Sequence, residues 1–377
     1  MNKQWPTVKL GEITRDLTQT RTFIVQPDDV IVDPTIQSAT HRISAAATSR
    51  GFEVKVNKRI KINHGDLVFS RLHTQNGAFA FSDGNFQATG TFLPLAIIEE
   101  KADQRFLFWA LHQFVPSLSA SDTVGRETYK TDDILALEIP LPPLTEQKRV
   151  VARIEELSAQ IQEARTLRQK AKEEGEALLR SILTHDEQSK PTPMRELVKL
   201  RPPDVTVCAE EIYQFAGVYC FGRGVFKSVQ KSGIDFAYPR LTRLRAGEFV
   251  YPKLMAWEGA FGVVPPECDG CVVSTEFPVF EVNQKRVLPE VLDTYFRTPS
   301  VWPEIAGKST GTNIRRRRLN PQDFLDYEMP LPSMETQMTL RKVRAEVDAL
   351  KRMQAETAEE LDALLPSILD KAFKGEL

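Results

Sequence analysis

Hydrophobic residues recur at alternating spacings of three and four in two long segments, residues 144–185 and 334–377. This heptad pattern predicts helices that bury one narrow stripe of side chains against another helix. Polar Arg168, Gln354 and Thr357 fall on the stripe, where they either set the register of the pairing or face a protein partner. The predicted seam comprises Ile154, Leu157, Ile161, Leu178 and Ile182 in the first segment, and Leu340, Val343, Val347, Leu350, Leu361, Leu364 and Ile368 in the second.

A different pattern precedes each helix. Residues 52–62 alternate apolar and polar side chains, and residues 66–72 form an apolar run after a glycine, so both stretches predict strands. We therefore expect two β-rich domains, residues 1–143 and 186–333, each followed by a long helix. The proline at position 366 is expected to kink the last turns of the second helix.

The chain repeats its own motifs at a period near half its length. Residues 140–147 (PLPPLTEQ) return as residues 330–337 (PLPSMETQ). Upstream, GDLVF and GAF within residues 65–79 match GEFVY and GAF within residues 247–261. A duplicated unit predicts internal two-fold pseudo-symmetry, which would turn the two helices antiparallel. The expected fold is α+β, with two pseudo-symmetric β-rich domains joined by two long antiparallel helices that form a coiled coil.

Composition narrows the class of protein only a little. A hydrophobic content of 41% and a charged content of 27% are ordinary for a folded soluble protein. The sequence has neither an apolar run long enough to span a membrane nor the apolar core of a signal peptide, so we expect a cytoplasmic protein. The net charge is −2 and neither β-rich segment is basic overall, so any DNA-binding charge must be concentrated on one face.

Catalytic and metal-binding patterns occur only as fragments. Residues 307–309 (GKS) resemble the end of a phosphate-binding loop, but Trp302 stands where the first glycine is required. Cys268 and Cys271 have the spacing of a zinc knuckle, yet no second pair of ligands follows at that spacing. We therefore expect no catalytic residue, no metal site and no cofactor bound by this chain.

The densest cationic cluster lies just before the second proline-rich motif. Guanidinium groups suit both phosphates and guanine edges, so adjacent arginines in a loop are candidates for DNA binding. The equivalent stretch of the first half is basic and aromatic but weaker. The candidates are Arg315, Arg316, Arg317 and Arg318 in the second half, and Arg126, Tyr129 and Lys130 in the first.

A second pair of candidate loops lies between the repeated strand and the repeated GAF motif. The flanking sequences match between the two halves while the loop contents differ sharply. Two copies of one scaffold that read different DNA sequences would show this pattern, although ordinary loop drift would also produce it. The candidates are Arg71, His73, Thr74 and Gln75 in the first half, and Lys253 and Trp257 in the second.

Taken together, the repeated proline-rich motifs, the long helices and the two related endings ALLRSIL at residues 177–183 and ALLPSIL at residues 363–369 resemble the specificity subunit of type I restriction–modification systems. The resemblance covers essentially the whole chain in order. It implies two target recognition domains, each reading one half of a bipartite, asymmetric site on double-stranded DNA, with the helices as a ruler between them.

The resemblance also implies partners. Two methyltransferase (modification) subunits would dock on the helices and adjacent domain surfaces, bind S-adenosylmethionine and methylate adenine. Restriction (translocase) subunits that use ATP and Mg²⁺ would join them, and no membrane is involved. Two alternatives stay open on the sequence: the specificity component of a bifunctional, type II-like restriction and methylation enzyme, and a coiled-coil adaptor that binds no DNA.

Overall fold

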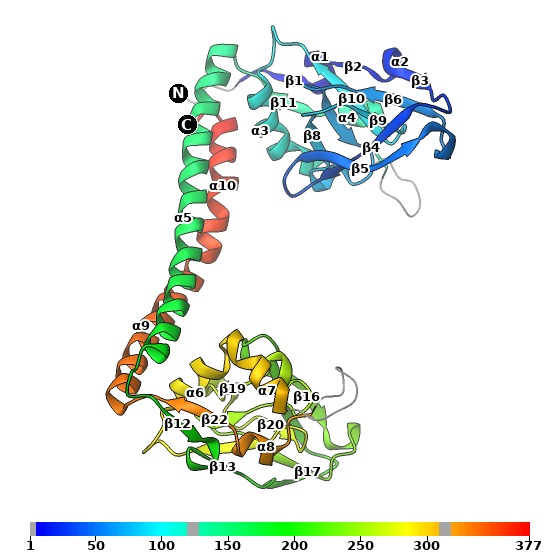
Figure 1. Ribbon diagram of the computed structural model, residues 1–377. Coiled ribbons are helices and arrows are strands. Elements are labelled where there is room, and N and C mark those ends of the chain that lie inside the picture. Colours follow the sequence, from blue (N-terminus) through cyan, green and yellow to red (C-terminus); the bar gives the residue numbers. More distant parts are fainter. Residues whose placement is uncertain (1–4, 119–127, 309–317) are drawn as a thin grey trace. The chain divides into compact units, whose positions relative to one another are not determined.

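The computed structural model describes residues 5–118, 128–308 and 318–377, and the chain divides into two compact units. Unit 1 comprises residues 1–165 and 357–377, and unit 2 comprises residues 166–356. Each unit holds one β-rich domain together with parts of two long helices (Figure 1). The predicted α+β organisation is confirmed.

Unit 1 is built from short antiparallel sheets and a few helices. Its largest sheet has the strand order β2-β10-β7-β8, and smaller sheets have the orders β3-β6-β9, β4-β5 and β1-β11. The strands are β1 (Thr7–Lys9), β2 (Thr14–Asp16), β3 (Thr22–Ile24), β4 (Val30–Gln37), β5 (Arg42–Arg50), β6 (Lys58–Ile62), β7 (Leu67–Ser70), β8 (Phe79–Phe81), β9 (Phe86–Ala88), β10 (Phe92–Ile97) and β11 (Glu138–Pro140). The helices are α1 (Leu10–Ile13), α2 (Thr18–Arg21), α3 (Gln104–Phe114), α4 (Thr131–Leu135), the first part of α5 (Leu144–Thr184) and α10 (Ala358–Phe373).

Unit 2 repeats this plan. The sheet β13-β21-β18-β19 corresponds to the largest sheet of unit 1, and β14-β17-β20-β15-β16 combines the counterparts of β3-β6-β9 and β4-β5. The strands are β12 (Lys190–Pro193), β13 (Val198–Leu200), β14 (Val205–Thr206), β15 (Ile212–Tyr219), β16 (Gly224–Ser232), β17 (Arg240–Arg243), β18 (Phe249–Val250), β19 (Gly262–Val263), β20 (Val272–Ser274), β21 (Val279–Val282) and β22 (Glu328–Leu331). The helices are the rest of α5, α6 (Pro289–Phe296), α7 (Trp302–Lys308), α8 (Pro321–Leu325) and α9 (Met334–Glu356).

The core of each unit lies between its four-stranded sheet, one short helix and the long helices. In unit 1, Phe69 from the sheet and Phe106 from α3 share a buried cluster with Ile154 of α5 and Phe373 of α10. The rings of Phe106 and Phe373 meet edge to face with centroids 5.5 Å apart. Burial of such large aromatic side chains joins the β-rich domain firmly to the helices.

A buried glutamine near the start of each long helix fixes that helix to the domain before it. The Gln147 amide oxygen accepts a hydrogen bond from the Asp103 backbone N–H (2.8 Å), and its nitrogen donates to the Lys101 and Pro142 carbonyls (2.9 and 2.8 Å). Gln337 makes the same three contacts in unit 2, with the Leu288 N–H and with the Arg286 and Pro332 carbonyls. The glutamine shared by the two proline-rich motifs therefore has the same structural role in both units.

Within each unit the long helices pair in antiparallel fashion. In unit 1, Arg149 of α5 donates to the Leu377 carbonyl while Arg165, four turns later, forms an ion pair with Asp362. In unit 2, the polar seam residues Arg168 and Gln354 bond reciprocally to each other's backbone carbonyls at 3.4 and 3.5 Å. Of the two roles open to these polar residues, the structure therefore favours setting the register.

Ten of the twelve predicted seam residues are buried or half-buried, and the prediction is wrong for the other two, which are exposed. Leu178 and Leu364 are 51% and 44% exposed, and the adjacent Leu179 is buried in place of Leu178. The reason is that a straight α-helix has 3.6 residues per turn, so a strict heptad stripe drifts off the buried face over several turns. The residues buried or half-buried as expected are Ile154, Leu157, Ile161, Ile182, Leu340, Val343, Val347, Leu350, Leu361 and Ile368.

The second long helix is interrupted, which the sequence did not predict. It ends as α9 at Glu356 and resumes as α10 at Ala358, so Thr357 separates the two helices. Pro366 lies inside α10, which continues to Phe373. The kink expected at Pro366 stays a prediction.

Candidate nucleic-acid interface

The two loops that the sequence singles out in each half lie side by side in the structure. In unit 1, the backbone N–H of Tyr129 donates to the Arg71 carbonyl at 2.9 Å, and the Arg71 guanidinium donates to the Thr131 hydroxyl at 2.7 Å. In unit 2, the N–H of Leu319 donates to the Lys253 carbonyl at 2.9 Å. Because the same backbone contact recurs, each unit presents one composite surface made from both of its candidate loops.

Arg71 is the central cation of the unit 1 surface. Its side chain is half-buried, and among the described residues the Arg71 Nε atom has no hydrogen-bond partner. Burial lowers the pKa of the guanidinium, while the nearby Asp16 carboxylate opposes the shift. An arginine remains charged under such a shift, so Arg71 contributes a positive charge to this surface.

Two of the predicted contact residues are buried, which corrects the prediction for them. The Tyr129 and Thr74 side chains are both 0% exposed. The Tyr129 hydroxyl donates to Gln75 Oε1 at 2.8 Å, and the Thr74 hydroxyl donates to the Ser70 carbonyl at 2.6 Å. Since neither presents any surface, both position the loop rather than touch a ligand. His73 and Lys130 are exposed, as a contact residue must be.

In unit 2, two predicted cations share one carboxylate. Arg318 forms an ion pair with Glu276, and Lys253 Nζ lies 4.0 Å from the same carboxylate while donating to the Thr275 carbonyl at 2.9 Å. The three side chains together carry a net charge of about +1 at neutral pH. Trp257 is half-buried, and its buried indole N–H has no partner among the described residues. Arg126, Arg315, Arg316 and Arg317 lie outside the described residues.

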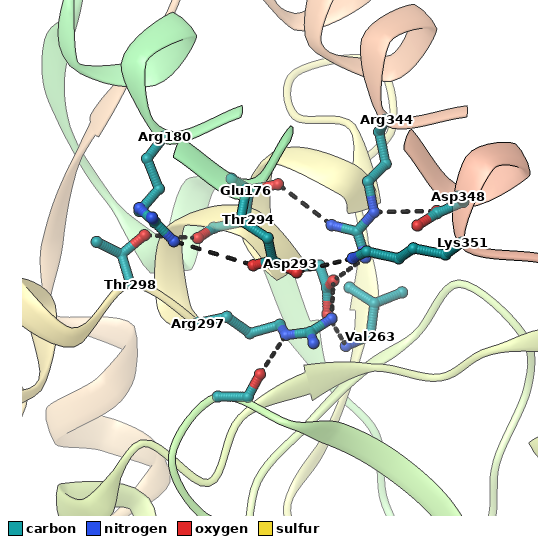
Figure 2. Close-up of polar contacts among 11 residues, drawn as sticks. Glu176, Arg180, Val263, Asp293, Thr294, Arg297, Thr298, Arg344, Asp348 and Lys351 are labelled. Carbon is teal, nitrogen blue, oxygen red and sulfur yellow. Dashed lines mark hydrogen bonds and ion pairs between the residues drawn. The ribbon is translucent and has the colours of Figure 1, made fainter. Parts of the chain in front are cut away.

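A charged network that the sequence analysis missed joins the second domain to its helices (Figure 2). Asp293 of α6, only 8% exposed, accepts from Arg344 of α9 at 2.8 Å and from Arg297 at 3.0 Å. Burial alone would raise the pKa of the Asp293 carboxyl, but the two guanidinium groups hold it below its usual value. Lys351 of α9 pairs with Glu176 of α5 at 2.7 Å. In unit 2 this ionic network therefore adds to the apolar core that the domain shares with Leu179 of α5 and Leu340 of α9.

Weak signals for this network were present in the sequence. Arg341, Arg344 and Asp348 are spaced three and four residues apart on α9, which places them on one helix face. Arg341 forms an ion pair with Glu290 at 3.1 Å, and Arg344 with Asp348 at 3.0 Å. The partners on α6 come from a segment about fifty residues earlier, which spacing along the chain does not reveal.

Within the described ranges, no three His, Cys, Asp or Glu side chains are grouped so that they could hold a metal ion. Cys268 and Cys271 are buried next to each other, and burial raises the pKa of the Cys268 thiol to about 11. In the part of the chain that the structure describes, no helix has an apolar stretch sufficient to cross a bilayer.

Comparisons with known proteins show what this chain is similar to. Residues 2–173 match the family described as the type I restriction modification DNA specificity domain. The EcoBI type I restriction enzyme specificity subunit of Escherichia coli is 24% identical, over 78% of this chain and 72% of that protein.

Two solved structures share the fold over the whole chain. One is the HsdS subunit from Thermoanaerobacter tengcongensis, with 23% identity, coverage of 100% of this chain and 98% of that one, and a TM-score of 0.57. The other comes from a structure concerned with complex assembly and conformational transition of the type I R-M system, with 24% identity, coverage of 100% and 99%, and a TM-score of 0.69. These two matches show the fold alone. Residues 2–173 thus match a type I restriction modification DNA specificity domain, and the chain is similar to a specificity subunit of a type I restriction enzyme.

Proposed function

We propose that each β-rich domain of this chain reads one half of a bipartite DNA site, and that the paired helices set the length of the unread gap. The supporting observation is the duplicated composite surface: the loops around Arg71 in unit 1 and around Lys253 in unit 2 have equivalent backbone contacts but different side chains. The same backbone arrangement holds the DNA-reading loops in both units. Because the side chains on these loops differ, the two half-sites that they recognise differ in sequence.

We further propose that two methyltransferase subunits dock on this chain at equivalent places. The two leucines that leave the seam, Leu178 and Leu364, occupy the same position in the repeated ALL motif, and both are exposed. The support for this docking site is that both exposed leucines recur at the same place of the repeat. In this proposal the partners bind S-adenosylmethionine and methylate adenine, restriction subunits use ATP and Mg²⁺, and this cytoplasmic chain catalyses no step.

The experiment is co-expression with the candidate methyltransferase subunit, followed by genome-wide mapping of methylated adenines by single-molecule sequencing. The expected result is one two-part motif with a gap of fixed length. A stable complex that adds no new methylation would refute the DNA-reading role. Native mass spectrometry tests the docking sites, because Leu178→Glu and Leu364→Glu should each remove one methyltransferase subunit from the complex. Retention of both subunits in both variants would refute this docking site.

A further inference from the structure

A β-hairpin that the sequence repeat does not reveal is present in both units. The hairpins β4–β5 and β15–β16 have strands of eight and nine residues joined by a four-residue turn, and each is followed by a short 3₁₀ helix that begins with glycine. Each pairing is also irregular at the same place, next to Pro34 in one hairpin and next to Ala216 in the other. Aligned position by position, residues 30–51 and 212–233 share a single identity, Gly51 with Gly233.

That shared glycine has a steric cause. A Cβ atom at Gly51 would lie 1.8 Å from the Gln26 carbonyl oxygen, and one at Gly233 would lie 2.1 Å from the Cys208 carbonyl oxygen. Both distances are far below van der Waals contact, so any other residue would displace the returning end of the hairpin. The geometry of the hairpin is therefore maintained in both units while nearly every side chain along it differs.

The outer strand of each hairpin is exposed over its middle part. Among the described strands, β5 pairs only with β4, and β16 pairs only with β15. Residues 44–48 of β5 and 227–231 of β16 are all exposed, so both faces of the strand are open to solvent. A strand that packs on a core buries alternate side chains, which these residues do not. Core packing therefore does not dictate these side chains, and they are free to serve recognition.

The charge of the outer strands suits a polyanion. The chain as a whole has 49 basic and 51 acidic residues, yet neither β5 nor β16 contains an acidic one. Arg42 of β5 and Lys227 and Lys231 of β16 form no ion pair within the described part of the chain. Their positive charge is thus not neutralised by the protein itself.

The residue types also match contacts to DNA bases. Lysine recognises guanine, glutamine recognises adenine, serine and threonine bond to several bases, and an alanine methyl contacts the thymine methyl. Strand β16 presents Lys227, Gln230 and Lys231, whereas β5 presents Ser44 and Thr48 on either side of three alanines. A two-stranded β-ribbon is of the size that the major groove of B-DNA admits.

The turn of each hairpin is anchored to the rest of its unit. In unit 2, the N–H groups of Phe221 and Gly222 donate to the Glu258 and Gly259 carbonyls at 2.8 and 3.0 Å. In unit 1, the His41 ring lies 4.3 Å from the Phe79 ring, centroid to centroid. Both anchors are in or beside the GAF loops described above, so hairpin and loops form one continuous, preorganised surface in each unit.

We propose that the outer strands β5 and β16 are the direct base-reading elements, with β5 specifying one half-site and β16 the other through the major groove. This inference rests on the proposed function and names the elements that carry out the reading. The ordinary alternative is that edge-strand lysines only prevent strand pairing between molecules.

The test uses the full chain in complex with its methyltransferase partner, and reads the methylated motif of each variant. The double variant Lys227→Ala, Lys231→Ala should relax one half of the motif only, and Ser44→Ala, Thr48→Val should relax the other half only. Each lost base contact should lower discrimination at its position by about 5- to 150-fold. The matched control Lys285→Ala removes an exposed lysine of the same unit and should leave the motif unchanged.

The outcomes separate the strand assignment from the proposed function. If the unmodified complex produces a two-part motif and neither double variant changes it, the strands do not read DNA. If the β16 variant aggregates while its soluble fraction retains the motif, the lysines only protect the edge, and the assignment is also refuted. Failure of the unmodified complex to produce a two-part motif would instead refute the proposed function. The double variant Lys227→Arg, Lys231→Arg retains both positive charges. Comparison with it shows whether the double alanine variant has a folding defect.

Discussion

Replacement of the buried glutamine at the start of α5 gives a quantitative test of how each domain is fixed to its helix. Gln147→Glu retains size and shape, and the acceptor for the Asp103 N–H remains. The new group cannot donate when ionised, so the Lys101 and Pro142 carbonyls each lose a hydrogen bond and face a carboxylate instead. Two lost bonds in a fully buried site should cost about 2–4 kcal/mol of stability in unit 1.

The cost should depend on pH with a definite sign. Burial opposite two carbonyl oxygens raises the pKa of the introduced carboxyl in the folded state above its unfolded value of about 4.3. Below that value the group is neutral in both states and the destabilisation is smallest. As the pH rises toward the folded-state pKa, destabilisation grows by about 1.4 kcal/mol for each unit of pKa difference and then levels off.

Hydrogen exchange measured by mass spectrometry is the suitable assay, because a chain of two units need not unfold in one step. Peptides covering residues 101–107 should lose protection in Gln147→Glu, and peptides covering residues 286–292 should lose protection in the equivalent Gln337→Glu. Gln160→Glu adds the same charge at an exposed position of α5 and serves as the control. If Gln147→Glu exchanges like this control at pH 7, the structural role assigned to the glutamine is refuted.

Three further predictions follow from the same contacts. Leu179→Ala should destabilise unit 2 by about 2–4 kcal/mol while Leu178→Ala costs less than about 0.5 kcal/mol, measured by urea unfolding, and equal costs would contradict the corrected seam. Asp293→Asn should destabilise unit 2 by about 3 kcal/mol because two half-buried guanidinium groups lose their buried anion. Because the folded-state pKa of Asp293 is depressed, this carboxylate stabilises the folded state above the unfolded pKa of about 3.9. That stabilisation is lost as the pH falls through the lower folded-state pKa. The sign is checked by measuring the free energy of unfolding of the parent chain and of this variant as a function of acid pH. Glu276→Gln should tighten DNA binding at low salt because it frees the two cations that share this carboxylate, and an unchanged affinity in a salt titration would remove this surface from the interface.

Much of the architecture could be predicted because its signals are local or exactly repeated in sequence. The heptad spacing predicts the long helices, and the shared PLP motif marks where each begins. The sequence could not predict that Leu179 is buried instead of Leu178. The buried face of a helix drifts around its axis by an amount that depends on how the two helices pack over several turns. The heptad spacing of hydrophobic residues gives no information about that packing.

The candidate site was less accessible to sequence reasoning. Tyr129 was a candidate contact residue because tyrosine has both an aromatic ring and a hydroxyl group. In the structure its side chain is buried in the core, and its hydroxyl donates to Gln75 and positions that side chain. The sequence does not reveal the two hairpins as a repeat, because they share a backbone but only the glycine pair Gly51 and Gly233 is identical. Spacing cannot find a repeat whose side chains have diverged almost completely.

The most direct test of a two-part reader is to make both parts the same. In this chimera the β-rich segment of unit 1, residues 5–140, is replaced by its counterpart from unit 2, residues 190–330, and the chain is expressed with its methyltransferase partner for adenine methylation mapping. Two identical readers related by a two-fold axis should recognise an inverted repeat, so the account predicts a palindromic motif built from the original second half-site alone. Retention of the original asymmetric motif would contradict it.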